Sequence, residues 1–120
     1  MKVSELTGAK LDYWVGKAND IADLNIVNGR CFHGNCNKEW VKLYSPSTDW
    51  SQCGPIIERE KIMLNPIDPG VWGAGVEVER LAGESFMVYE NGSTPLEAAM
   101  RCYVASKFGE EVPDIKDAPQ

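Results

Sequence analysis

Hydroxyl, acidic and aromatic side chains are concentrated in residues 44–57, whose sequence is YSPSTDWSQCGPII. The serine–proline pair predicts a turn, and the Ser-Thr-Asp run after it is typical of a helix cap. Backbone N–H groups at a helix start can bind an anion or a polar ligand, and aromatic rings can stack on a flat one. An elaborate helix cap is the alternative interpretation. The predicted ligand-binding residues are Tyr44, Ser47, Thr48, Asp49, Trp50, Ser51, Gln52 and Gly54, together with the cationic candidates Arg59 and Arg101.

Two thiols and the single histidine lie within six residues, in the sequence CFHGNC at 31–36. Cys31, His33 and Cys36, with Cys53 further along the chain, offer the nitrogen and sulfur ligands that zinc prefers. The second paired knuckle of a zinc site is missing, which favours incidental thiols. A thiol–histidine catalytic pair would need a nearby base and a lowered thiol pKa, and no nucleophile-elbow pattern surrounds either cysteine. We therefore predict no catalytic residues and no cofactor, with zinc as the weaker alternative.

Paired acids occur at Glu77 and Glu79, inside the segment VWGAGVEVER. Residues two apart on a strand share a face, so these carboxylates could converge on a reaction centre. A hydrophobic residue lies between them, which is the pattern of a half-buried strand. We interpret the pair as the solvent face of that strand.

The secondary structure around these residues is predicted from the spacing of apolar residues and from helix-cap residues. The chain around residues 48–61 is either one kinked helix or a turn followed by a helix that begins at Pro55, and we favour the second. Residues 19–39 are expected to be a long loop with a short strand at 24–27. We also predict helices over residues 1–18 and 94–109, strands at 62–64, 71–80 and 86–90, and a turn at 65–70.

This order of elements predicts an α+β fold, with a small antiparallel sheet of about three strands covered by helices, similar to an α-β-α sandwich. The length of 120 residues fits one domain. We assign residues 1–109 to that domain and residues 110–120 to an acidic, flexible tail. A core of this size is compatible with a homo-oligomer.

The charge balance narrows the class of partner. Eighteen acidic and twelve basic residues give a net charge of −6, whereas proteins that bind nucleic acid normally carry a basic face. The sequence has no apolar stretch of the ~20 residues that a membrane helix needs, and its first residues lack the apolar block of a signal peptide. We therefore expect a cytoplasmic protein that binds neither nucleic acid nor membrane.

Three blocks of the sequence together resemble the small phage and prophage family called NinX, and more distantly the phage α-β-α sandwich proteins. The resemblance implies a fold and a phage context, and it supplies no catalytic residues. Family members tend to have glycine in place of Cys53 and a shorter segment before the Tyr-Ser-Pro motif, so the region of Cys31, His33 and Cys36 looks particular to this chain. The blocks are SELTGAKLDYWVGKA (4–18), YSPSTDWSQCGPIIERE (44–60) and STPLEAAMRCYVASKFGEEV (93–112).

Three hypotheses for the function of a phage accessory protein follow. The first is a non-enzymatic binder of a small polar or nucleotide-like ligand, which could sequester a host signal. The second is a protein-interaction module that modulates a host protein through the acidic surface. An enzyme with a metal or thiol site between Cys31 and Cys53 is the third and weakest.

Overall fold

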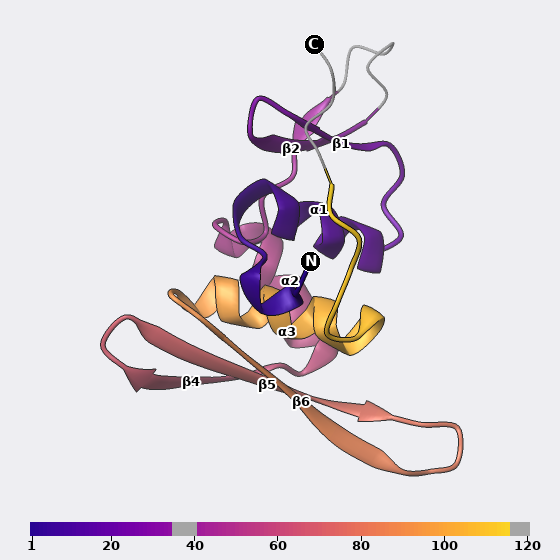
Figure 1. Ribbon diagram of the computed structural model, residues 1–120, viewed down its shortest axis with the longest axis vertical. Coiled ribbons are helices and arrows are strands. Elements are labelled where there is room, and N and C mark those ends of the chain that lie inside the picture. The colour runs from indigo at the N-terminus through magenta and orange to yellow at the C-terminus, as the bar shows by residue number, and fades with distance from the viewer. Residues whose placement is uncertain (35–40, 116–120) are drawn as a thin grey trace.

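The computed structural model describes residues 1–34 and 41–115, and these residues form an α+β fold, which confirms the predicted class (Figure 1). The described residues contain three α-helices and two three-stranded antiparallel sheets, ordered β1-β2-β3 and β4-β5-β6. The elements in chain order are a 3-10 turn η1 (Val3–Glu5), α1 (Gly8–Ala18), β1 (Leu24–Val27), β2 (Arg30–His33), β3 (Lys42–Leu43), α2 (Trp50–Glu60), β4 (Met63–Asp68), β5 (Val71–Glu79), β6 (Ser85–Gly92) and α3 (Pro95–Phe108).

Helix α3 lies at the centre of the fold, between the β4-β5-β6 sheet and α1, and α2 also packs against it (Figure 1). Its predicted cap is confirmed, because the Thr94 hydroxyl accepts a hydrogen bond from the Glu97 amide at 3.1 Å. The Glu97 carboxylate in turn accepts one from the Ser93 amide at 3.0 Å. The apolar stripe of this helix is buried, and its members are Leu96, Ala99, Met100, Tyr103 and Val104.

Helix α2 is a single helix, so the favoured prediction of a helix that begins at Pro55 is wrong. The helix begins at Trp50, because the Asp49 side chain caps it by accepting from the Ser51 amide at 2.9 Å. Proline normally interrupts a helix because it lacks an N–H. Here Cys53 and Ile56 are buried on either side of the exposed Pro55, and their packing holds both turns in line.

The segment predicted as a loop contains a second sheet. The short strand at 24–27 is confirmed as β1, and it pairs with β2 in an antiparallel hairpin. Asn28 and Gly29 form its turn with φ angles of 53° and 73°. An Asn-Gly pair favours this turn because both residues tolerate positive φ, so the signal for the hairpin was present in the sequence.

The β4-β5-β6 sheet agrees with the expected antiparallel meander, but β4 runs to Asp68 through residues predicted to be a turn. The turn falls later, at Pro69 and Gly70. One face of this sheet packs against α3, and no other described element lies against the opposite face (Figure 1). We call that opposite side the outer face.

The two ends of the described chain are joined. The Val3 amide donates to the Glu110 carbonyl at 2.9 Å, and the Val112 amide donates to the Met1 carbonyl at 3.0 Å. Val112 is buried, at 4% exposure. Residues 110–112 therefore pack with the folded body. Within the described residues, no helix combines the length and the apolar character needed to cross a membrane.

Candidate functional site

The bend that precedes α2, residues 45–49, is held by hydrogen bonds within itself and to the first turn of the helix. The Thr48 and Asp49 amides both donate to the Ser45 carbonyl, at 3.1 and 2.9 Å. The Asp49 carboxylate accepts from the hydroxyl and the amide of Ser51, and these hydrogen bonds lower the pKa of Asp49. The Gln52 side chain closes the bend by accepting from the Ser45 amide at 2.9 Å. These N–H and O–H donors are therefore used in hydrogen bonds that cap α2.

A pocket of about 370 Å³ nevertheless opens beside this bend, and we call it the Asp12 pocket. Its walls come from α1, from the β1–β2 turn and β2, and from the segment that leads into the cap. Its lining residues are Gly8, Ala9, Asp12, Gly29, Arg30, Cys31, Leu43, Tyr44, Ser45, Ser47 and Thr48.

Asp12 is the buried charge of this pocket, with 5% of its surface exposed. Its carboxylate accepts a hydrogen bond from the Ser47 amide at 2.8 Å. Burial raises the pKa of Asp12 to about 6, even though hydrogen bonding from Ser47 acts in the opposite direction. The Ser47 hydroxyl is buried beside this carboxylate and acts on its pKa, although it forms no hydrogen bond of ordinary geometry with any described residue. The pocket thus combines a recessed acceptor with a buried hydroxyl.

The thiols near this carboxylate are unreactive. Burial, followed by the charge of Asp12, raises the pKa of Cys31 and of Cys53 to about 12. Both thiols therefore stay protonated at neutral pH, and a protonated thiol is a poor nucleophile and a poor metal ligand. His33 packs its ring edge-on against Tyr44, with centroids 5.6 Å apart.

A metal site is not assembled by the described residues, which contain no group of three or more His, Cys, Asp or Glu side chains positioned to hold an ion. Cys36, the remaining candidate ligand, lies outside the described residues.

The family model of bacteriophage P22 NinX matches residues 2–107, a span that includes the whole Asp12 pocket. The chain belongs to the NinX family. A comparison with curated proteins finds no match. Family membership makes the chain a phage accessory protein.

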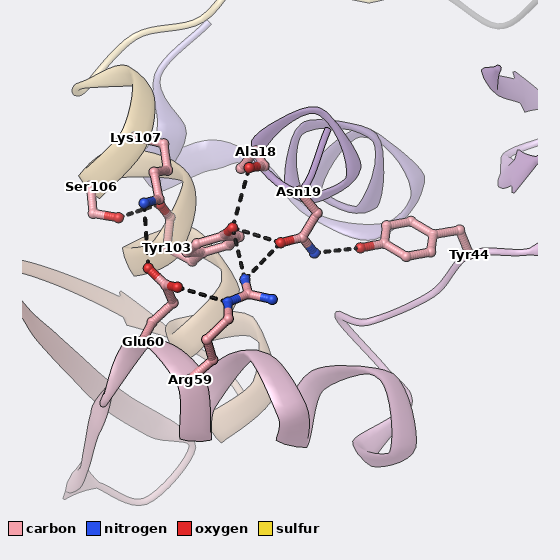
Figure 2. Close-up of polar contacts among 8 residues, drawn as sticks. All are labelled: Ala18, Asn19, Tyr44, Arg59, Glu60, Tyr103, Ser106 and Lys107. Atoms are coloured by element: carbon pink, nitrogen blue, oxygen red, sulfur yellow. Dashed lines mark hydrogen bonds and ion pairs between the residues drawn. The ribbon is translucent and has the colours of Figure 1, made fainter. Parts of the chain in front are cut away.

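Arg59 of this NinX-family protein lies in a polar cluster that joins three helices (Figure 2). Its guanidinium donates to the Asn19 side chain at 2.8 Å and to the Tyr103 hydroxyl at 3.0 Å. It also pairs with Glu60 at 2.8 Å, and Glu60 lies 3.4 Å from the Lys107 ammonium. Asn19 links the cluster to Tyr44 through a hydrogen bond of 3.1 Å. Arg59 thus connects with the Asp12 pocket through Asn19 and Tyr44.

Arg101 is likewise engaged within the NinX fold. Its guanidinium donates to the Leu6 and Asn91 carbonyls, at 2.8 and 2.9 Å, and lies 3.3 Å from Glu97. The structure therefore brings three predicted ligand residues, Tyr44, Ser47 and Thr48, to the Asp12 pocket. The others lie outside its lining: Asp49, Trp50, Ser51, Gln52, Gly54, Arg59 and Arg101.

Sequence reasoning missed Asp12, which completes the pocket. A signal was available, because this charged residue directly follows the buried Leu11 and precedes the buried Val15 by three positions on α1. A charged side chain on the apolar stripe of a helix becomes buried, and its burial is unfavourable unless it has a hydrogen-bond or ion-pair partner. It is therefore a better site candidate than an exposed charge.

Proposed function

We propose that this NinX-family protein is a non-enzymatic binder of a small polar, nucleotide-like ligand that occupies the Asp12 pocket. The observation that carries the proposal is the recessed Asp12 carboxylate, which lines the pocket next to the buried Ser47 side chain. The pocket volume of about 370 Å³ lies within the usual range for small-molecule sites. In an infected cell, such a protein would sequester a host signalling molecule.

The energetics of Asp12 support a role in binding. A carboxylate that burial holds near a pKa of 6 destabilises the fold at neutral pH. A ligand that donates N–H groups to it would supply the compensation that the protein itself lacks. Perturbed acids in a pocket are candidates for functional sites for this reason.

The surrounding residues favour a nucleotide over other polar molecules. A nucleobase edge presents N–H donors that a carboxylate can accept. Tyr44 supplies an aromatic side chain to the lining, and Arg30 is an exposed cation of the same pocket that can attract a phosphate. The protonated Cys31 thiol is a poor nucleophile, which supports binding without turnover.

The proposal is tested by calorimetric titration of the protein with the purine and pyrimidine nucleoside monophosphates. We expect at least one to bind, and Asp12→Asn to weaken that binding by roughly tenfold or more, because an amide cannot match a carboxylate as an acceptor of paired N–H donors. Asp68→Asn is the matched control, since Asp68 is exposed at the end of β4 and should leave binding unchanged. Binding of none of them, or equal binding by Asp12→Asn, contradicts the proposal.

A further inference from the structure

The outer face of the β4-β5-β6 sheet carries a groove made of two hollows. One hollow, of about 400 Å³, lies between Met63, Ile67 and Tyr89. The other, of about 340 Å³, is lined by Glu77, Glu79 and Met87. Met63 and Gly75 line both hollows, so the two are continuous. We call this surface the outer groove. It lies at the end of the molecule away from α1 and β2, and thus away from the Asp12 pocket (Figure 1).

The floor of the apolar hollow is glycine backbone. A Cβ added at Gly73 would lie 2.8 Å from the Ile67 Cδ1 atom, and one at Gly75 would lie 2.9 Å from the Tyr89 Cε1 atom. The side chains of Ile67 and Tyr89 therefore lean over bare backbone. They remain 48% and 66% exposed, and Met63 beside them is 54% exposed. A cluster of large apolar groups over an uncovered sheet face is typical of a contact surface.

The second hollow makes the groove acidic along β5. Glu77 and Glu79 are exposed on the same face, and neither forms an ion pair in the described part of the chain. Glu60 also lines this hollow, but Arg59 and Lys107 already neutralise it. Lys61 is the cation on the same lining, so the carboxylates Glu77 and Glu79 leave an excess of negative charge.

The charge pattern identifies the occupant. Two copies of the chain that met through this face would bring their Glu77 and Glu79 carboxylates towards one another, and like charges in close contact are unfavourable. An anionic membrane surface or a nucleic acid would be repelled in the same way. Lysine or arginine side chains beside apolar ones would match both hollows at once.

We propose that the outer groove docks a segment of another protein in which apolar side chains are followed by basic ones. The apolar side chains pack in the hollow against Met63, Ile67 and Tyr89, and the basic side chains pair with Glu77 and Glu79. This surface acts independently of ligand binding in the Asp12 pocket.

The test uses a short fluorescein-labelled peptide with a leucine–valine block followed by a lysine block. Two comparison peptides replace the lysines with glutamates or the apolar block with serines. Fluorescence polarisation should show binding of the first peptide only, weakened by added salt. Amide resonances of Gly73 and Gly75 should shift on titration, while those of Asp12 and Ser47 should not.

Matched variants separate the two parts of the groove. Glu77→Gln with Glu79→Gln should weaken peptide binding by roughly three- to tenfold, whereas Glu5→Gln with Glu58→Gln makes the same charge change at exposed positions elsewhere and should not. Tyr89→Ser should weaken binding similarly, and Leu81→Ser, at the fully exposed β5–β6 turn, should have no effect. All these positions are exposed, so thermal unfolding should confirm that the variants fold.

Three outcomes would overturn the proposal. One is the absence of peptide binding, another is equal binding of the glutamate peptide, and the third is a dimer of the wild-type chain that Tyr89→Ser dissociates, since that would assign the groove to a second copy.

Discussion

At the scale of single residues, Asp12 is a carboxylate whose negative charge is disfavoured by its burial. Its carboxylate accepts a hydrogen bond from the Ser47 amide, and burial raises its pKa to about 6. Asp49 shows the opposite behaviour, because several donors surround it in the open and its pKa is lowered. The same residue type thus acts as a cap in one place and as a buried acceptor in the other.

We predict that Asp12→Asn stabilises the unliganded protein at neutral pH. The folded-state pKa of about 6 exceeds the ordinary value of 3.8, so the folded state binds this proton more tightly. The resulting stabilisation is complete below about pH 4 and is lost as the pH rises through 6. At pH 7 the ionised carboxylate costs about 3 kcal/mol relative to its protonated form.

Urea unfolding at about pH 4 and pH 7 checks this prediction. The variant should exceed the wild type by roughly 1–3 kcal/mol at neutral pH and by much less in acid. Asp68→Asn, at an exposed position, should have the same free energy of unfolding as the wild type at both pH values. A wild-type–variant difference that does not change with pH would show that Asp12 is not held in its buried, high-pKa environment.

At the scale of elements, the polar cluster in Figure 2 links the three helices through side-chain hydrogen bonds. Tyr103 of α3 donates to the Asn19 side chain at 2.6 Å and accepts from Arg59 of α2 at 3.0 Å. Asn19 directly follows α1, so one hydroxyl joins all three helices. The Arg59 guanidinium also lies 5.8 Å from the centre of the Tyr103 ring, in cation–π geometry.

We expect Tyr103→Phe to lower the free energy of unfolding by about 1–2 kcal/mol, because the Asn19 side chain and the Arg59 guanidinium each lose a hydrogen-bond partner. Tyr89→Phe is the matched control, since Tyr89 is 66% exposed and should contribute little through its hydroxyl. Denaturant unfolding of both variants measures the difference. Equal losses in the two would show that the cluster does not hold the helices together.

At the scale of the whole molecule, the first residues of the chain form backbone hydrogen bonds with residues that follow α3. Met1 to Val3 pair with Glu110 to Val112, and Lys10 of α1 reaches Asp114 at 2.8 Å. The family match ends at residue 107, so this pairing lies partly beyond the matched segment. This pairing holds η1 in place, and η1 in turn contacts α3.

We predict that Val112→Ala destabilises the protein by about 1–3 kcal/mol, because it leaves a cavity at a position that is 4% exposed. Val41→Ala removes the same atoms from a side chain that is 45% exposed and should change stability little. Thermal unfolding of the pair measures the contrast. If the two variants unfold together, the residues after α3 do not contribute to the folded core.

The predictions that succeeded rest on local rules. The helix from Thr94 is confirmed because its cap, its first-turn proline and its apolar stripe all lie within one continuous segment. The β1–β2 hairpin was missed although Asn28 and Gly29 signalled it, since the strands beside them are short. The helix through Pro55 was mispredicted because the packing of Cys53 and Ile56 outweighs the local cost of proline.

The sequence alone therefore determined the caps, the α+β class and the NinX resemblance, all of which depend on residue order and on hydrogen bonds that span a few positions. The packing of the elements, by contrast, leaves the Thr48 and Asp49 amides of the bend bonded within it and leaves the outer face of β4-β5-β6 without a covering element among the described residues. It also decided that Asp12 is buried, because the amide that meets its carboxylate lies 35 positions along the chain. Burial and long-range partners depend on how the elements pack, and no local pattern encodes that packing.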